Sequence, residues 1–428
     1  MKISPARIAA FEILLKIERD RAFSSVLLPE AEQHLLEKDK GLCHEIVLGV
    51  LRKKLYLDAV IAAFGKPRRL DPEVATTLRI GLYQILFLDR VPGYSAVNDS
   101  VNLVKHARKT SAKGFVNALL RHAEPVELSF ADDIDRISVE TSHPRWLIEK
   151  WANEFGVAEA EATAKANNIP SVNSFRITAK GKLRNLAIPD GAVPSTVIEG
   201  CLLMERIMPQ IREMTENGEI YFQDEGSQLV AALADVPKGG KFLDVCAAPG
   251  SKTGMIGDVH SEQMITIFAG DVNRSRVEFL RANCLNQGLN GLNYVQYDAA
   301  VSLPFEEGSF DSILVDAPCS GTGTIKNNPE IRYFLNPSDF RELHYKQLAI
   351  LTNASKLLTP GGRLVYSTCS LEREENEDVV NSFLARSEDF EIKQPISASR
   401  FVNAERFVRT SPARDGFDGF FAATIGRK

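Results

Sequence analysis

The second half of the chain alternates between strand-like and helix-like segments. Five apolar runs of strand length each end in an acid, a small residue or a cysteine: "KFLDVCAA", "MITIFAGD", "LNYVQYD", "FDSILVDAP" and "GRLVYSTC". Helix-like segments such as "SRVEFLRANCLNQ" separate them. Strands that alternate with helices pair in parallel and are covered on both faces, so this region is predicted to be a doubly wound α/β sheet. Two late runs, "RFVRT" and "GFFAATIG", have no helix between them and predict an antiparallel edge.

The first part of the chain has a different periodicity. From Ala6 to about Ala123 the apolar residues recur at helical spacing and the prolines fall mostly between the runs, which predicts five to seven helices. Residues 124 to 144 are polar and acidic and indicate a linker. The length of 428 residues favours two or three domains. The predicted domains are an all-α domain at 1–125, a small α+β module at 140–220 and the α/β domain at 221–428.

Charge is unevenly distributed. The net charge is −5, but residues 1–125 carry 20 Lys and Arg against 14 Asp and Glu, a surplus of +6 that leaves −11 for the remainder. The positive residues form three clusters, "LRKK" (51–54), "KPRR" (66–69) and "KHARKTSAK" (105–113). A charge cluster is most often a solvated helix face. Three of them in one small region of an acidic chain favour a polyanionic partner, either RNA or DNA.

The hydrophobic runs and the cysteines predict the cellular compartment of the protein and whether it binds a metal. The N-terminus has a charge every few residues and no run is long enough to span a membrane, so we expect a cytoplasmic protein that does not contact membranes. The six cysteines are scattered, without a CxxC motif or a His pair at helical spacing. Reduced thiols and the absence of a metal site are therefore expected.

The segment "LDVCAAPGSKT" (243–253) leaves the first strand and turns into a helix. Neither the phosphate-loop spacing nor the strict GxGxxG motif is present. Asp271 ends the next strand, where an acid suits a ribose diol, so the preferred ligand is an adenosine without phosphates, S-adenosylmethionine. A purely structural turn is the alternative. Acids also close the first, third and fourth strands (Asp244, Asp298 and Asp316), and four acids at successive strand ends predict one cleft rim.

Two cysteines follow the last two of these strands. In a sheet with the strand order of methyltransferases these strands are neighbours about 5 Å apart, so Cys319 and Cys369 are predicted to face one pocket. A thiolate that adds to carbon 6 of a pyrimidine activates carbon 5 toward methylation, and Asp316 could hold the base at its N3 edge, which suits cytosine. The residues alone leave open which thiol attacks. The cysteines inside helical or apolar runs are expected to be inert: Cys43, Cys201 and Cys284.

Four motifs carry a resemblance to a known family. In this order and spacing, "LDVCAAPGSK", "AGD", "VDAPCSGTG" and "YSTCS" resemble the RNA 5-methylcytosine methyltransferases. An all-helical N-terminal domain similar to the transcription factor NusB indicates the bacterial Sun/RsmB branch, which "YFQDEGSQL" and "DGFDGFFAA" also fit. The resemblance covers essentially the whole chain. Its fold is a Rossmann-like methyltransferase sheet preceded by the NusB-like domain.

The resemblance implies methylation of a cytosine in small-subunit (16S) ribosomal RNA with S-adenosyl-L-methionine. It implies that Cys369 is the nucleophile and that Cys319 assists product release. Relatives usually have a glycine at position 251; if that position needs positive φ, Ser251 is strained and cofactor affinity falls slightly. The implied cofactor site consists of Cys246, Ala247, Ala248, Pro249, Gly250, Ser251, Lys252, Asp271, Asp298 and Asp316.

Two rival functions belong to other classes. The first is an RNA-binding assembly factor whose methyltransferase domain is vestigial. The second is a nucleotide hydrolase that uses "PGSKT", which would need ATP and magnesium. The expected protein is a monomeric methyltransferase with ribosomal RNA as its partner. The sequence does not specify which cytosine is methylated, whether naked RNA or an assembling subunit is the substrate, or which base removes the carbon-5 proton.

Overall fold

The computed structural model describes residues 3–64 and 70–428, which form two compact units. The helical unit comprises Met1–Ile169 together with Ile325–Leu335. The sheet unit comprises Pro170–Thr324 and Asn336–Lys428. Among the described residues, no helix is long and apolar enough to cross a membrane.

The helical unit packs its helices around a core of side chains such as Ile46, Leu78 and Leu103, which are fully buried. Six α-helices precede residue 125 in the described chain, within the predicted range. The helices of this unit are α1 (Pro5–Asp20), α2 (Ser24–Glu32), α3 (Glu37–Phe64), α4 (Pro72–Phe87), α5 (Gly93–His106), α6 (Lys113–Arg121), α7 (Asp133–Thr141), α8 (Arg145–Phe155), α9 (Val157–Ala166) and α15 (Ile331–Phe334), with a 3-10 turn at Thr110–Ala112.

The predicted linker at 124–144 contains a helix, α7. Asp132 caps it, because its Oδ1 accepts a hydrogen bond of 2.8 Å from the backbone N–H of Asp135. This cap explains why an acidic, polar stretch still folds. Helix α7 packs against α3, α8 and α9. Residues 140–169, which the sequence pattern groups with the α+β module, therefore lie in the helical unit.

A short segment, residues 325–335, leaves the sheet unit and is built into the helical unit. The carboxylate of Glu330 accepts hydrogen bonds from the backbone N–H and the hydroxyl of Ser24 at 2.6 and 2.9 Å. The Tyr333 hydroxyl donates to the carbonyl oxygen of Leu51 at 2.7 Å. We call these residues the inserted segment. It connects the loop after Cys319 with the start of α16 (Asp339–Ser355).

The N-terminal part of the sheet unit is a small antiparallel sheet with strand order β2-β3-β1-β4. Its core contains Phe175, Leu202, Ile211 and Ile220. The elements are β1 (Asn173–Ile177), α10 (Ala179–Leu183), β2 (Val193–Pro194), β3 (Cys201–Met204), α11 (Pro209–Glu216) and β4 (Ile220–Phe222).

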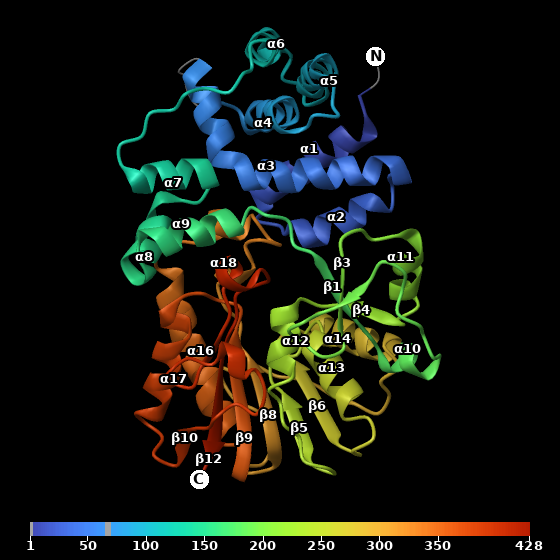
Figure 1. Cartoon of the computed structure of the whole chain (residues 1–428), viewed down its shortest axis with the longest axis vertical. Coiled ribbons are helices and arrows are strands. Elements are labelled where there is room, and N and C mark those ends of the chain that lie inside the picture. Colours follow the sequence, from blue (N-terminus) through green and yellow to red (C-terminus); the bar gives the residue numbers. More distant parts are fainter. Residues whose placement is uncertain (1–2, 65–69) are drawn as a thin grey trace. The chain divides into compact units, whose positions relative to one another are not determined.

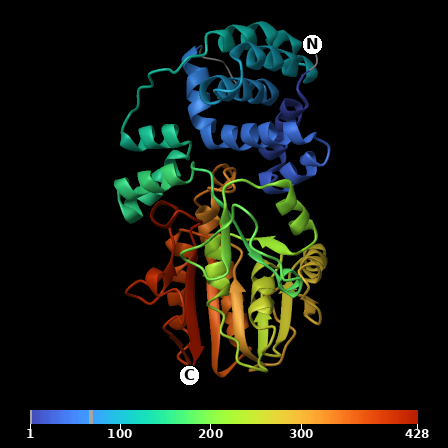
Figure 2. The same ribbon diagram turned by 45° about the vertical axis from the view of Figure 1, so that its right-hand side comes forward.

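The large sheet has the strand order β10-β12-β9-β8-β5-β6-β7, with β11 paired to β12. Figure 1 labels its strands from β10 to β6, and Figure 2 shows the same sheet turned by 45°. Strands β5 to β9 pair in parallel, as predicted. Strand β12 pairs antiparallel to β9, but β10 lies outside it and forms the edge. The strands are β5 (Lys241–Asp244), β6 (Thr266–Asp271), β7 (Asn293–Gln296), β8 (Phe310–Asp316), β9 (Leu358–Thr368), β10 (Phe390–Ile392), β11 (Val408–Arg409) and β12 (Phe421–Arg427).

Successive residues of the central strands point to opposite faces of the sheet. Ile313 packs in one core with Leu351 of α16, whereas Leu314 packs in another with Ile256 of α13. The continuous apolar runs of the sequence follow from this burial on both faces. The helical elements of this part are α12 (Glu225–Ala231), α13 (Ser251–Val259), α14 (Arg274–Asn286), α16, α17 (Glu377–Leu384) and α18 (Pro412–Asp415), with 3-10 turns at Thr322–Thr324, Arg373–Glu375 and Ser399–Phe401.

Candidate active site

Three of the four strand-end acids gather at one edge of the sheet. Asp244, Asp271 and Asp316 end β5, β6 and β8, and β5 lies between the other two strands. Burial raises the pKa of the Cys246 thiol in their midst, and the three carboxylates raise it further. Asp298 lies two residues beyond β7 and is exposed, with its carboxylate accepting a hydrogen bond from Ala300 at 3.0 Å.

Asp244 carries an unused acceptor. Its Oδ2 accepts a hydrogen bond of 2.6 Å from the Thr253 hydroxyl, while its buried Oδ1 has no hydrogen-bond partner among the described residues. Burial raises the pKa of Asp244 to about 7, against the effect of the Thr253 hydrogen bond, and the nearby Asp316 charge adds to the rise. A buried acceptor without a donor is unfavourable. The site is therefore suited to a ligand that brings a donor.

The loop between β5 and α13 makes the tight turn that was predicted. Gly250 has φ +100°, and a Cβ there would lie 2.8 Å from Leu280 Cδ1, so both the backbone and the space require glycine. Ser251 is the first residue of α13 and does not have positive φ. The strain considered for Ser251 is therefore absent. Ala247 is buried and donates its N–H to Gly270 O at 2.8 Å, whereas Pro249 is exposed.

Lys252 and Asp316 form a buried ion pair in this loop region. The Lys252 Nζ lies 2.7 Å from Asp316 Oδ2 and 5.3 Å from the centre of the Phe420 ring. Burial works against the charge of Lys252, but the Asp316 carboxylate outweighs it and raises the pKa of the ammonium. Ser367 donates to the other oxygen, Asp316 Oδ1, at 2.8 Å. Both carboxylate oxygens of Asp316 thus accept a hydrogen bond, and the Lys252 ammonium forms an ion pair with Asp316.

The two predicted thiols meet. The Sγ atoms of Cys319 and Cys369 lie 3.1 Å apart, after the neighbouring strands β8 and β9. The hydrogen bond with Cys369 raises the pKa of Cys319 well above its usual range, and burial adds to this rise. Either sulfur could be the donor in this contact. If one thiol is ionised, the other is placed to act as its hydrogen-bond donor.

Three further cysteines, Cys43, Cys201 and Cys284, were expected to be inert. All are buried, and burial raises their pKa values to about 11 for Cys43, about 12 for Cys201 and about 12 for Cys284.

The predicted site did not include the group that links the two thiol loops. Glu375 is fully buried and accepts hydrogen bonds from Ser320 and Ser370, which directly follow the two cysteines. The repeated Cys-Ser pair in the sequence could have indicated that Ser320 and Ser370 belong to the site. Glu375 lies in the acidic run "EREENED" (372–378), and such a run usually indicates a solvated surface. Thr253 and Ser367, which orient the acids, were also missed.

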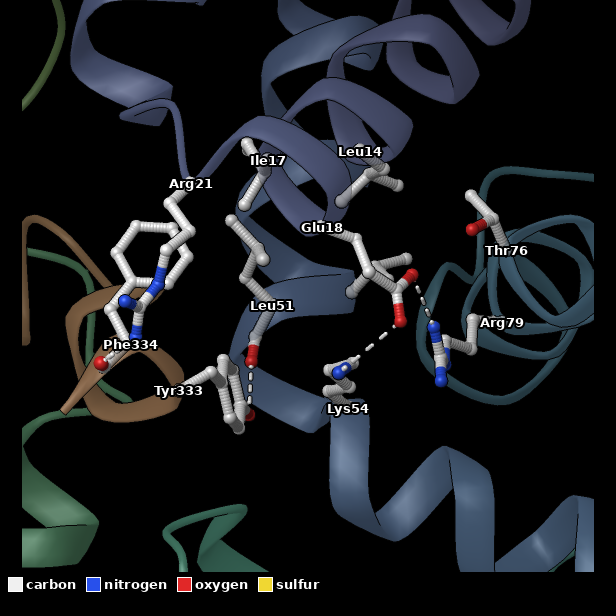
Figure 3. A pocket seen from close by; sticks show the side chains of 11 residues that line it. Leu14, Ile17, Glu18, Arg21, Leu51, Lys54, Thr76, Arg79, Tyr333 and Phe334 are labelled. Atoms are coloured by element: carbon white, nitrogen blue, oxygen red, sulfur yellow. Dashed lines mark hydrogen bonds and ion pairs between the residues drawn. The ribbon is translucent and has the colours of Figure 1, made fainter. Parts of the chain in front are cut away.

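The helical unit contains a separate cavity of about 130 Å³ (Figure 3). Its polar side chains are already paired: Glu18 lies 3.1 Å from Arg79 and 3.7 Å from Lys54, and Tyr333 bonds Leu51. This cavity lies where the inserted segment contacts α1 and α3. It contains none of the predicted catalytic residues.

The basic clusters differ in their surroundings. In the first, Arg52 donates to Lys326 O at 3.1 Å and Lys54 Nζ lies 3.7 Å from Glu18 Oε1. The cluster at 66–69 lies outside the described residues. In the third, Lys105 and Lys113 are exposed, whereas Lys109 pairs with Asp71 at 2.9 Å.

Comparison with known proteins decides the family. Residues 231–426 match the 16S rRNA methyltransferase RsmB/F family, and residues 4–125 match the NusB family. The probable ribosomal RNA small subunit methyltransferase B of Bacillus subtilis is 32% identical, with 100% of both chains covered. The chain belongs to this methyltransferase family. The ribosomal RNA small subunit methyltransferase B of Pseudomonas syringae is 31% identical, with 89% of this chain and 87% of the relative covered.

Two solved structures share the fold of this chain. The "Crystal Structure of PH0851" superposes with a TM-score of 0.82 at 26% identity and covers 100% of both chains. A methyltransferase homologue from Pyrococcus horikoshii has a TM-score of 0.57 at 24% identity, with 70% of this chain and 100% of that chain covered, and supports the fold. The chain is an RNA methyltransferase that uses S-adenosyl-L-methionine. The free oxygen of Asp244 and the buried carboxylate of Asp271 fit the donor groups of that cofactor.

Proposed function

We propose that the enzyme methylates carbon 5 of a cytosine in 16S ribosomal RNA, with Cys369 as the nucleophile and Cys319 as the thiol that assists product release. The distance of 3.1 Å between the two sulfurs carries this proposal, because a single thiol would suffice for adduct formation alone. The names of the curated relatives support small-subunit ribosomal RNA as the substrate.

The proposed chemistry follows from the weak nucleophilicity of cytosine carbon 5. The Cys369 thiolate adds to carbon 6, and the new S–C6 bond shifts electron density onto carbon 5. Bound S-adenosylmethionine would supply an electrophilic methyl group to this carbon; its S–CH₃ bond would break and the electron pair would stay on sulfur, which leaves as the neutral thioether S-adenosylhomocysteine. A base then removes the carbon-5 proton, the S–C6 bond breaks, and the electron pair that remains on sulfur regenerates the thiolate.

Two observations support Cys369 as the thiolate. The pKa of Cys319 is raised by its hydrogen bond to Cys369 and by burial, so Cys319 keeps its proton and donates it to the neighbouring sulfur. The Lys252 ammonium interacts electrostatically with Cys369. A nearby ammonium and a hydrogen-bond donor both favour a thiolate. After methylation, the same Cys319 proton is available to the leaving sulfur.

Asp316 is proposed to hold the target base at its N3 edge. Its oxygens are oriented by Lys252 on one side and Ser367 on the other, so the carboxylate is fixed in one direction. The cofactor site is proposed to comprise Cys246 to Lys252 with Asp271, Asp298 and Asp316, to which Asp244 is now added. The helical domain and the small sheet are proposed to bind RNA through its backbone and shape while the target base is unstacked.

Two cysteine substitutions test the assignment. Cys369→Ser is expected to abolish transfer of labelled methyl groups to 16S RNA while cofactor binding measured by calorimetry persists. Cys319→Ser is expected to accumulate a covalent protein–RNA adduct, visible as a slower band on a denaturing gel, and the double variant should form none. Normal turnover by Cys369→Ser would refute the nucleophile. If the wild-type protein bound no S-adenosylmethionine, the vestigial assembly factor would be favoured instead.

A further inference from the structure

One buried carboxylate is bonded to both thiol loops. The Glu375 Oε2 accepts hydrogen bonds from the backbone N–H of Ser320 at 2.8 Å and from the Gln347 side chain at 2.9 Å. Its Oε1 accepts from the hydroxyls of Ser320 and Ser370, the latter at 2.6 Å. Ser320 follows Cys319 and Ser370 follows Cys369. The carboxylate therefore bridges the two segments that carry sulfur.

The bridge is itself fixed on several sides. The Tyr366 hydroxyl donates to the backbone carbonyl of Glu375 at 2.6 Å, and Asn376 donates to the carbonyl of Ser370 at 2.9 Å. Gln347 also donates to the carbonyl of Pro318 at 3.0 Å, next to Cys319. Donors on both loops and on α16 thus converge on the carboxylate and its neighbours.

Glu375 is poorly suited to remove the carbon-5 proton. An ionised carboxylate offers about four lone-pair sites, and four donors occupy those of Glu375. Accepting a proton would break at least one of these bonds inside a buried site. Its role must therefore act through the residues that it holds.

We propose that Glu375 is a positioning residue that holds the Cys319 and Cys369 thiols at contact distance by bonding both of their loops. The consequence for catalysis rests on the proposed roles of the two thiols. Glu375 also has an electrostatic effect, because its negative charge contributes to the raised pKa of Cys319. Position and charge can be separated by substitution.

Glu375→Gln preserves shape and removes charge. Its amide oxygen can accept from Ser320 N–H and Gln347, while its NH₂ group donates to the two serine hydroxyls, which can rotate to accept. Glu375→Ala removes all four bonds. Glu377→Ala is the matched control, because Glu377 is also buried but pairs with Arg409 at 3.2 Å and has no hydrogen bond to Ser320 or Ser370 in the described structure.

The first measurement needs neither RNA nor cofactor. Phenylarsine oxide bridges two thiols only where they lie close together, and intact-mass spectrometry counts the bound arsenical on the folded protein. Wild type, Glu375→Gln and Glu377→Ala are expected to bind it, whereas Glu375→Ala should bind about tenfold more weakly or worse, because the effective concentration of one thiol near the other falls. Cys319→Ser and Cys369→Ser give the background.

The second measurement is turnover. Glu375→Ala is expected to lower kcat by about a hundredfold with unchanged KM for S-adenosylmethionine, because small misplacements of reacting groups have effects of this size. Glu375→Gln should recover most of that loss and shift the pH profile to lower pH, since the charge that raises the pKa of Cys319 is gone.

Two outcomes would overturn the proposal. In one, Glu375→Ala binds the arsenical as wild type does. In the other, Glu375→Ala and Glu377→Ala lose turnover and thermal stability equally, which indicates a general structural role. Activity of Cys369→Ser would refute the proposed function while leaving the arsenical result intact, so the two failures can be told apart.

Discussion

Charge is buried in two regions of this enzyme, and the two are built differently. In the helical unit, Arg332 of the inserted segment is fully buried and donates to the carbonyls of Thr141 and Pro329 at 3.1 and 3.0 Å and to the side chain of Asn168 at 3.0 Å. Glu330 beside it bonds Ser24. These polar groups join parts of the chain that are far apart in sequence.

At the strand ends of the sheet unit, acids of like charge crowd together instead. Asp244 is 1% exposed and has one oxygen without a partner. Such an arrangement does not favour folding, because burial and neighbouring charge both oppose ionisation of this carboxylate. Arg332 Nη2 also has no hydrogen-bond partner among the described residues, but the other two nitrogens of the guanidinium donate to oxygens. The comparison suggests a criterion: a buried charge surrounded by groups of opposite polarity, here called matched, supports the fold, whereas a carboxylate buried among other carboxylates, here called unmatched, is kept for a ligand.

The largest expected effect is on the stability of the helical unit, where the buried charge of Arg332 is matched. Arg332→Ala leaves a cavity and removes the donor of three buried hydrogen bonds, so the free energy of unfolding of the helical unit should fall by about 3 kcal/mol or more. Both tryptophans of the chain, Trp146 and Trp151, lie on α8, so urea unfolding followed by tryptophan fluorescence reports this unit. Arg121→Ala, at an exposed position of α6, is the control. A parallel loss of S-adenosylmethionine affinity in Arg332→Ala would break the comparison.

Substitution in the unmatched region should have effects of opposite sign on binding and stability. Asp244→Asn removes the charge. Calorimetry should show about 10- to 100-fold weaker binding of S-adenosylmethionine, because a hydrogen bond from the cofactor to a charged group is lost. The free protein should become more stable at pH 8, by on the order of 1–3 kcal/mol.

The sign follows from linkage. Because the folded pKa of about 7 lies above the unfolded value of 3.8, the contribution of Asp244 to stability is fully present below pH 3.8 and is lost as pH rises to about 7. Asparagine removes this pH dependence. Asp311→Asn, half-buried at the opposite end of β8, is the control. If Asp244→Asn bound the cofactor normally, the unpaired oxygen would have no functional meaning.

Much of the sheet unit could be predicted because its signals are local. Each parallel strand is a continuous apolar run, and the residues that follow β8 and β9 carry sulfur in the sequence itself. The strand order then brings Cys319 and Cys369 together. The α7 helix was missed although Asp132 is a capping residue, since the acidic composition around it obscured the periodicity.

Long-range contacts account for the rest. The inserted segment contacts Ser24 and Thr141 across hundreds of residues, and no local pattern announces such a partner. Glu375 was hidden for a related reason. Its carboxylate is buried by donors from the Ser320 loop, 55 residues earlier, so the acidic run that contains it resembles a surface until the fold is known.

The smallest expected effect is a pH dependence of the stability of the helical unit, and it also tests the comparison between the two regions. His143 in the helical unit is fully buried, with Nδ1 at 2.9 Å from Thr141 O and at 3.3 Å from Arg332 Nη1. Burial lowers the pKa of His143 well below 6.5, and the Arg332 cation adds to this. The folded state therefore binds this proton more weakly than the unfolded state does.

The contribution of His143 to the free energy of unfolding of the helical unit is fully present above pH 6.5. It is lost as the pH falls below that value, by about 1.4 kcal/mol for the first pH unit. Tryptophan-detected unfolding at pH 7.5 and 5.5 measures this loss, and His143→Gln should reduce the difference between the two pH values. His122→Gln, at an exposed position of the same unit, should leave it unchanged. Asp244 acts in the opposite direction over part of this range, since protonation favours its folded state. Lowering the pH should therefore destabilise the helical unit, whose buried groups are matched, and remove the unfavourable charge of Asp244 in the sheet unit. If the free energy of unfolding changed equally with pH in wild type and His143→Gln, a neutral His143 would make no contribution to the stability of the helical unit.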